Sequence, residues 1–162
     1  MTGFPDLRQA LARNPQGTAV EFGVASGLST RLIAAQMPVI GFDSFQGLPE
    51  DWRPGYPKGS MAFPMPTIDN ARLIEGWFAD TLPGFEWPDD IGLVHIDCDL
   101  YTSTTTALQH VGPHLKPGCL IVLDDYHPGD PHVYKAFHEA VEAHGWNVKQ
   151  QSDCFFTLES IS

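Results

Sequence analysis

The stretch TAVEFGVASGLSTRLIAAQM, residues 18–37, decides the fold predicted for this chain. Residues 18–25 form an apolar run with strand character that breaks at Ser26-Gly27, and residues 28–37 continue with helical periodicity. The next run, PVIGFDSF at 38–45, again has strand character. Together the three segments predict a strand–helix–strand unit, the building block of a parallel sheet.

The same alternation of strands and helices continues along the chain. Strand runs that are apolar throughout are typical of a parallel sheet covered by helices on both faces. Only a few residues join the final two strands, and because a parallel pair needs a crossover of about a dozen residues, we expect this pair to be antiparallel. The remaining elements are predicted at residues 6–13 (helix), 68–71 (helical turn), 72–78 and 90–97 (strands), 102–115 (helix), 119–126 (strand), 131–144 (helix, with Asp130 as N-cap, Pro131 at its first position and Gly145 just past its end), and 146–151 and 154–159 (strands).

Composition predicts a single globular domain and argues against two kinds of partner. The 162 residues fit one domain, and 43% of them are hydrophobic. The net charge of −11 argues against nucleic acid and anionic membrane surfaces, because both attract clustered lysine and arginine. The sequence shows neither a signal peptide nor an apolar run as long as a membrane span. Cys98, Cys119 and Cys154 lack CxxC spacing, so we expect reduced core thiols in a cytoplasmic protein.

The loop after the first predicted strand has the features of a nucleotide-type ligand site. Glu21, Gly23 and Gly27 form an E-x-G-x-x-x-G pattern, whose glycines allow close approach to a ligand at a helix N-terminus. A plain tight turn is the alternative, and the pattern lacks the third glycine of nicotinamide-binding loops. Asp43 ends the second strand about twenty residues later, where an acid can accept both hydroxyls of a ribose. The alternative for Asp43 is an Asx-type cap.

Acidic residues follow two other predicted strands. Asp97 ends one strand and Asp124-Asp125 ends the next, and neighbouring parallel strands lie about 4.8 Å apart. Carboxylates this close repel one another unless one is protonated or a cation intervenes, which predicts a divalent metal site. Mg²⁺ is the natural choice for such oxygen ligands, with Mn²⁺ or Ca²⁺ as rivals. The alternative makes Asp124 a cap for the following segment.

Asp99 follows Asp97 by two residues. If the extended backbone continues past the strand, both side chains lie on the same side, and Asp99 faces the site without being a ligand. A carboxylate beside an acceptor hydroxyl held near a metal is well placed as a general base. The alternative makes Asp99 the N-cap of the next helix.

A proline-rich loop at residues 46–67 is too long for a simple connection and is predicted to be an active-site lid or disordered. Trp52 and Tyr56 are expected either to face the acceptor or to pack on their own loop. His127 follows Asp125 closely enough to approach the metal or the acceptor, and a solvated loop position is the alternative.

The segments VEFGVASGLSTRLIA, GFDSFQGLPEDW, EGWFADTLP, LVHIDCDLYTSTTTAL and LIVLDDYH resemble the macrocin O-methyltransferase (TylF-like) group of class I S-adenosylmethionine-dependent methyltransferases. The resemblance covers roughly residues 18–128. It implies an α/β, Rossmann-like, doubly wound seven-stranded sheet of order 3-2-1-4-5-7-6. It also implies methylation of hydroxyl groups, often on the sugars of glycosylated natural products.

The resemblance assigns roles to individual residues. Those it implies for the cofactor are the loop residues Glu21, Gly23 and Gly27, Ser29 near the methionine carboxylate, Asp43 at the ribose, Ser44 and Phe45 by the adenosine, and Asp80 at the adenine edge. Asp97, Asp124 and Asp125 match the metal ligands, and Asp99 matches the proposed base. Members of this group carry a longer N-terminal segment that helps to cover the site and to form oligomers, whereas about seventeen residues precede the first strand here. The lid role then falls to residues 46–67, and homo-oligomerisation is left open.

The sequence therefore predicts a metal-dependent O-methyltransferase acting on a small-molecule hydroxyl. A catalytically inactive module that binds S-adenosylmethionine is the main alternative. A Mg²⁺-dependent phosphatase also uses a D-x-D pattern, but that pattern belongs on a first strand and requires Thr or Val where Tyr101 stands.

Overall fold

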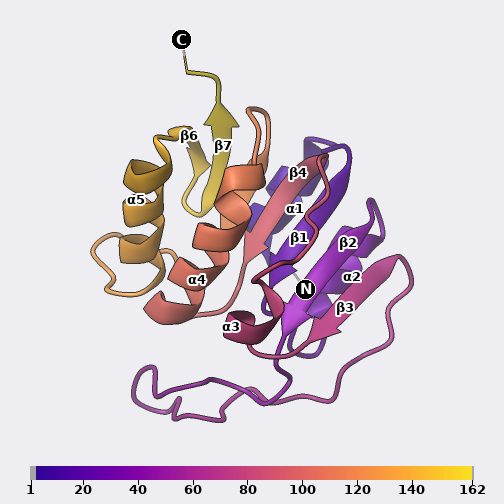
Figure 1. The fold of residues 1–162 in the computed structure, drawn as a ribbon, viewed down its shortest axis with the longest axis vertical. Helices are drawn as coiled ribbons and strands as arrows, with labels where there is room; N and C mark the ends of the chain where they lie inside the picture. Colours follow the sequence, from indigo (N-terminus) through magenta and orange to yellow (C-terminus); the bar gives the residue numbers. More distant parts are fainter. Residues whose placement is uncertain (1–2, 162) are drawn as a thin grey trace.

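The computed structural model describes residues 3–161, which form a seven-stranded sheet between two layers of helices (Figure 1). The order of the strands is β3-β2-β1-β4-β5-β7-β6. The first five pair in parallel, and β7 runs antiparallel to both β5 and β6. The predicted strand order and the antiparallel closing pair are confirmed. The strands are β1 (Thr18–Phe22), β2 (Val39–Asp43), β3 (Ala71–Glu75), β4 (Ile91–Ile96), β5 (Leu120–Leu123), β6 (Asn147–Ser152) and β7 (Phe155–Glu159).

Helices cover both faces of the sheet, as the apolar central strands require. One face packs against α1 and α2 through a core that includes Leu7 and Ile33. The other packs against α4 and α5 through a core that includes Leu108 and Phe137. The helices are α1 (Pro5–Ala12), α2 (Leu28–Ala34), α3 (Phe78–Thr81), α4 (Tyr101–Val111) and α5 (Val133–His144).

Several predicted element boundaries are wrong for local reasons. The predicted helical turn at 68–71 is absent, because Asn70 turns the chain with a φ of 63° and β3 begins at Ala71. The strand predicted at 72–78 ends at Glu75, since Gly76 has a φ of 146° and redirects the chain into α3. The helix predicted from 102 to 115 leaves α-geometry at Val111 and continues as the short 3₁₀ turn η1 (Gly112–His114), which contains Pro113.

The start of α5 also differs from the prediction. Asp130 and Pro131 lie in a turn before the helix, and the N-cap position belongs to His132. Asp130 accepts a hydrogen bond from the backbone N–H of His132 at 2.9 Å. The Asp130 side chain therefore stabilises the loop before α5 and does not cap the helix itself.

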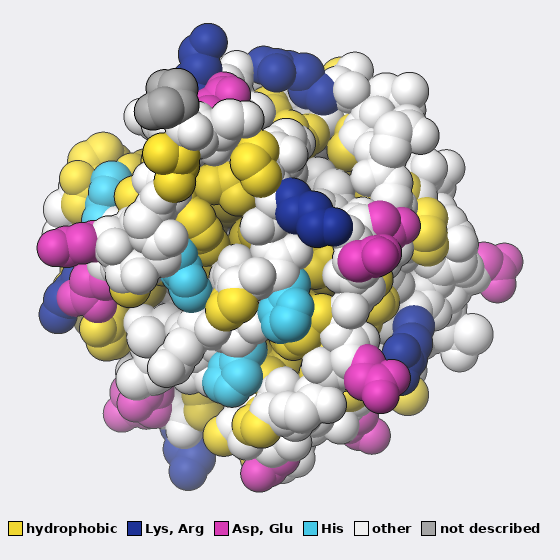
Figure 2. Space-filling view, turned by 45° about the horizontal axis from the view of Figure 1, so that its top comes forward, with side chains coloured by type: hydrophobic (Ala, Val, Ile, Leu, Met, Phe, Trp, Pro, Cys, Tyr) yellow, Lys and Arg dark blue, Asp and Glu magenta, His cyan; other side chains and the backbone are white. Residues whose placement is uncertain are grey.

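The three cysteines within the sheet and its loops are free thiols, and Cys119 is buried in the core. Within residues 3–161 no helix is long and apolar enough to cross a bilayer. On the face shown in Figure 2, lysine and arginine side chains lie apart from one another among acids and histidines, without forming one basic patch.

The carboxyl ends of β1, β2, β4 and β5 meet at one edge of the sheet, where ligands bind in open parallel sheets. The loop at 46–67 lies beyond the arrowheads of β2 and β3, at the bottom of Figure 1. Its base is closed by two backbone hydrogen bonds, from Leu48 N–H to Ser60 O and from Gly59 N–H to Leu48 O, each 2.9 Å long. These bonds give residues 48–60 a closed, internally bonded conformation.

Candidate active site

A cavity of about 490 Å³ opens at this edge of the sheet. Its walls come from the loops after β1, β2, β4 and β5, the segment from Gly76 to Ala79 after β3, the first two turns of α4, and the loop at 46–67, whose role as a lid stays a prediction. The site residues that the sequence predicted and that line this cavity are Gly23, Asp43, Ser44, Trp52, Tyr56, Asp97, Asp99, Asp124 and Asp125. One cavity therefore contains both the glycine loop and the acidic residues.

Asp97 and Asp124 are placed side by side by strand register. Ile96 pairs with Leu123 in the parallel ladder of β4 and β5, so the next residue of each strand is an aspartate facing the same edge. The ladder extends one step further, since Asp124 N–H donates to Ile96 O at 2.8 Å. The predicted proximity of these two carboxylates follows directly from the register.

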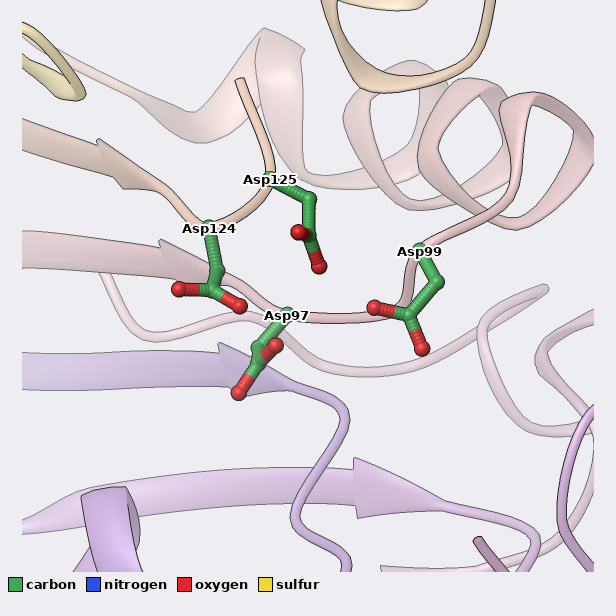
Figure 3. Close-up of side chains that lie close together, drawn as sticks. All are labelled: Asp97, Asp99, Asp124 and Asp125. Carbon is green, nitrogen blue, oxygen red and sulfur yellow. The ribbon is translucent and has the colours of Figure 1, made fainter. Parts of the chain in front are cut away.

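Asp99 reaches the same place by a route that the sequence did not predict. The expected extended backbone is wrong, because Asp99 has a φ of 64° and Leu100 N–H donates back to Cys98 O at 2.7 Å. Figure 3 shows the resulting turn directing the Asp99 carboxylate back toward Asp97 and Asp125. Asp125 also has a positive φ, of 57°. Non-glycine residues in this region are strained and are concentrated at functional sites.

The four carboxylates form one cluster (Figure 3). One oxygen of each of Asp97, Asp99, Asp124 and Asp125 lies within 4.8 Å of the others. Oxygens gathered this closely would let one small divalent cation contact several of them. The hard carboxylate oxygens thus fit a divalent cation. The distances do not separate Asp99 from the three predicted ligands, and its distinct role as base stays a prediction.

The alternative structural roles of these acids are not observed in the described residues. The N-cap of α4 is Leu100 rather than Asp99, and no side chain caps this helix. The carboxylate of Asp124 likewise makes no capping hydrogen bond to the segment after it in residues 3–161.

Burial and mutual repulsion raise the proton affinity of this cluster. Burial raises the pKa of Asp97 well above its usual range, and the neighbouring Asp124 charge adds to the effect. Burial, and then Asp125, raises the pKa of Asp99 to about 8. Burial and the Asp124 charge also raise the pKa of Asp125. A bound cation opposes these shifts, because it stabilises the charged form of every carboxylate.

The glycine loop lies against the acidic strand. Gly23 has a φ of 96°, and a Cβ atom there would lie 2.6 Å from the carbonyl carbon of Asp97. Gly27 has a φ of 93°, and a Cβ atom there would lie 2.7 Å from the side chain of Ile68. The positive φ and the close neighbouring atoms leave no room for a side chain at either position. Of the two glycines, Gly23 lines the cavity and Gly27 does not.

Asp43 fixes the shape of that loop. Its carboxylate accepts hydrogen bonds from the backbone N–H groups of Val24, Ala25 and Phe45, each at 2.8 Å. The bond from Phe45 is the Asx-type contact that was the alternative to a ribose role. A carboxylate has about four lone-pair sites, so roughly one stays open toward the cavity. Ribose binding by Asp43 stays a prediction, and the carboxylate can accept about one further hydrogen bond, from a ribose hydroxyl.

Glu21 acts through other residues rather than on the cavity. It is fully buried, accepts a hydrogen bond from the hydroxyl of Thr30, and contacts His95 Nδ1 at 2.7 Å. This arrangement ties β1 to α2 and β4, and makes His95 a hydrogen-bonded histidine of the core.

The remaining predicted cofactor residues lie at or beyond the margin of the cavity. Ser29 and Phe45 are buried behind the wall, and Asp80 is exposed on α3. Ser44 is inside, where its hydroxyl accepts the N–H of Gln46 at 3.1 Å. The contacts of Ser29, Phe45 and Asp80 with a cofactor stay predictions.

The packing of Trp52 and Tyr56 on their own loop is confirmed, and their contact with an acceptor stays a prediction. Trp52 and Tyr56 pack on one another with ring centroids 5.2 Å apart, and both line the cavity. His127 is largely exposed, and its Nε2 lies 3.9 Å from an oxygen of Asp125. Arg53, which was not among the predicted site residues, lies between the two lid aromatics and also lines the cavity.

The family and fold agree with known methyltransferases. A family model described as a methyltransferase domain matches residues 20–126. The chain is 32% identical over 149 residues to 8-demethyl-8-(2,3-dimethoxy-alpha-L-rhamnosyl)-tetracenomycin-C 4'-O-methyltransferase of Streptomyces olivaceus, covering 74% of this chain and 57% of that protein. It is 35% identical over 77 residues to mycinamicin III 3''-O-methyltransferase of Micromonospora griseorubida, covering 48% of this chain and 29% of that protein.

A solved structure of the calicheamicin methyltransferase CalS11 shares the fold, with a TM-score of 0.76 at 22% identity over 96% of this chain and 78% of that chain. The chain spans less than two thirds of the length of the curated relatives it matches. The resemblance to the macrocin O-methyltransferase (TylF-like) group is confirmed by these relatives. The chain therefore belongs to the methyltransferase-domain family.

Proposed function

We propose that this chain transfers a methyl group from S-adenosylmethionine to a hydroxyl of a small molecule, a sugar or a glycosylated natural product. The observation that supports this most strongly is the four-carboxylate cluster in the same cavity as Gly23 and Asp43. The two curated relatives carry names of O-methyltransferases acting on such compounds. We further propose that residues 46–67 act as the lid of one catalytic domain, and that the protein works in the cytoplasm.

In this proposal the chain supplies binding, orientation and proton transfer. The loop held by Asp43 and Gly23 receives the cofactor, and the lid aromatics form the opposite wall, against the acceptor. Asp97, Asp124 and Asp125 would hold a divalent cation, which supplies positive charge that favours ionisation of the acceptor hydroxyl. Asp99 takes the hydroxyl proton as the methyl group transfers, and its carboxylate lies in the same cluster. Fixing donor and acceptor in one cavity supplies the orientation.

The direct test follows the product S-adenosylhomocysteine by mass spectrometry. The full chain is incubated with S-adenosylmethionine, Mg²⁺ and a panel of deoxysugar glycosides and nucleotide sugars. We expect S-adenosylhomocysteine and an acceptor gaining one methylene mass, with both lost in EDTA and restored by Mg²⁺. Turnover that persists in EDTA would remove the metal from the proposal.

Binding without product is the outcome expected of an inactive module. Calorimetry with S-adenosylmethionine would then show affinity, while no acceptor in the panel yields S-adenosylhomocysteine. Hydrolysis of p-nitrophenyl phosphate would instead point to a phosphatase. The D-x-D acids follow β4 rather than the first strand, which disfavours that reading.

A further inference from the structure

The tip of the lid is a small hairpin with its own internal bonds. Trp52 N–H donates to Tyr56 O at 3.0 Å, and Tyr56 N–H donates to Arg53 O at 2.8 Å. Pro54 and Gly55 occupy the turn between them, and the φ of 88° at Gly55 fits the third residue of a type II turn. These hydrogen bonds fix the shape of the tip. They do not fix its position over the cavity, which depends on contacts between the tip and other parts of the chain.

Arg53 lies between this hairpin and the acid cluster. Its guanidinium carbon is 3.7 Å from the centroid of the Trp52 ring and 5.3 Å from that of Tyr56. Its Nη2 lies 3.8 Å from Asp125 Oδ1. Of the residues lining the cavity, Arg53 alone carries a lysine or arginine side chain. Arg53 thus lies within ion-pair distance of Asp125, one of the four carboxylates.

A second contact joins the lid to the same side of the cavity. The hydroxyl of Thr102, in the first turn of α4, donates to Glu50 Oε1 at 2.8 Å. The base of the loop is thus closed at Leu48 and Ser60, and Glu50 is bound to α4. Among the described residues, the contact that joins the hairpin tip to the acids is that of Arg53 with Asp125.

We propose that Arg53 is a positioning residue that latches the lid tip over the acid cluster through Asp125. The Arg53 guanidinium stacks on Trp52 and lies near Tyr56, so its attraction to the Asp125 carboxylate also holds these two rings in place. The latch therefore keeps both rings in the cavity wall. That this wall matters for an acceptor rests on the proposed function. The latch does not depend on the proposed function, because the contact is between two side chains of the protein itself.

Hydrogen exchange of the lid amides measures this latch directly. The full chain is followed by mass spectrometry in chelator-containing buffer, on peptides covering residues 48–60. Arg53→Gln, Asp125→Asn and the double variant are compared with Lys58→Gln, which removes an exposed lid cation that does not line the cavity. Thermal melts confirm that each variant is folded. No acceptor or cofactor is needed, so the result is independent of whether methyl transfer is found.

We expect Arg53→Gln and Asp125→Asn each to speed exchange of the lid amides about two- to fivefold, the range set by one partly exposed ion pair. The double variant should exchange no faster than either single variant, because both remove the same contact. Lys58→Gln should match the parent chain. Raising NaCl from about 0.05 to about 0.5 M should speed exchange in the parent chain and leave Arg53→Gln unchanged, since salt screens such a pair.

Two results would overturn the latch. If Arg53→Gln speeds exchange while Asp125→Asn does not, Arg53 acts only by stacking within its hairpin. If neither variant differs from Lys58→Gln, the contact has no effect on the lid. Arg53→Lys provides a further check: it keeps the charge but loses the planar stack on Trp52, and the latch requires its exchange to fall between those of the parent chain and Arg53→Gln.

Discussion

Gly23 lies so close to Asp97 that a single β-carbon at Gly23 would overlap the Asp97 carbonyl oxygen. The glycine loop and the acidic strand are thus in direct backbone contact, and the proposed cofactor and metal sites share one wall. A change on one side of this contact is transmitted to the other side without an intervening side chain.

Gly23→Ala should therefore destabilise the fold and weaken both sites. Gly118→Ala is a matched control, since Gly118 has a similar φ of 97° but a Cβ atom there would meet no other atom within 4 Å. The control should lower the melting temperature by about 2–8 °C, from about 1–2 kcal/mol of left-handed strain in a domain of this size. Gly23→Ala should lower it further and weaken the binding of both S-adenosylhomocysteine and Mg²⁺ in calorimetry. Equal effects of the two changes would contradict the shared wall.

Asp99→Asn separates binding from proton transfer. We expect the binding of S-adenosylmethionine and Mg²⁺ to stay near parent values, while turnover falls about 10²- to 10⁴-fold, the usual contribution of a general base. Asp97→Asn serves as the comparison and should lose Mg²⁺ affinity. A fully active Asp99→Asn variant would remove the base assignment.

Mg²⁺ should stabilise the folded chain. At about 100 times its dissociation constant a ligand adds about 2.7 kcal/mol to the free energy of unfolding, or about 5–11 °C in a domain of this size. Differential scanning fluorimetry with Mg²⁺, against EDTA, measures the shift. The Asp97→Asn/Asp124→Asn variant should show little shift, and an equal shift in that variant would place the ion elsewhere.

The stability of the metal-free chain should fall as the pH rises toward 8. The pKa of Asp99 is raised to about 8, above the value of an unfolded aspartate, about 3.9. Between those values the folded chain binds more protons than the unfolded chain, so the contribution of this group to the free energy of unfolding falls with increasing pH. Melting temperatures in EDTA from pH 5 to 8 test the slope. Asp99→Asn should flatten it, and an unchanged slope would exclude this source.

Glu21→Gln should weaken the fold while leaving the chemistry of the cavity in place. Leaving a buried hydrogen-bonding group without its partner costs about 1–3 kcal/mol, and Glu21 is fully buried against His95 and Thr30. We expect a lower melting temperature and weaker S-adenosylmethionine binding, with kcat at saturating cofactor nearly unchanged. A large loss in kcat alone would show that Glu21 takes part more directly.

The parallel sheet, its antiparallel closing pair and the meeting of the glycine loop with two acidic strands were predictable from the sequence, whereas the order of the strands was implied only by the family resemblance. The predictable features follow from apolar runs, connection lengths and the shared edge of parallel strands. The register that sets Asp97 beside Asp124 is of this kind.

The placement of Asp99 and Arg53 was not predictable in the same way. The residue type of Asp99 does not show that its backbone has a positive φ, because this conformation depends on the surrounding loop, which compensates its strain. Arg53 reaches the cluster through a turn in a distant loop, and no local pattern reports such a contact. For Asp43, the residue type was informative but ambiguous, since one carboxylate can accept hydrogen bonds from loop amides and also from a ligand.

The closed base and self-bonded tip of residues 46–67 have an evolutionary consequence. A segment that supplies most of its own hydrogen bonds can change sequence without repacking the sheet beneath it. If the proposed function holds, acceptor preference can change through this one loop, while the strand ends that carry the acids stay as they are. Exchange of residues 46–67 as a whole is then the natural way to alter which hydroxyl is methylated.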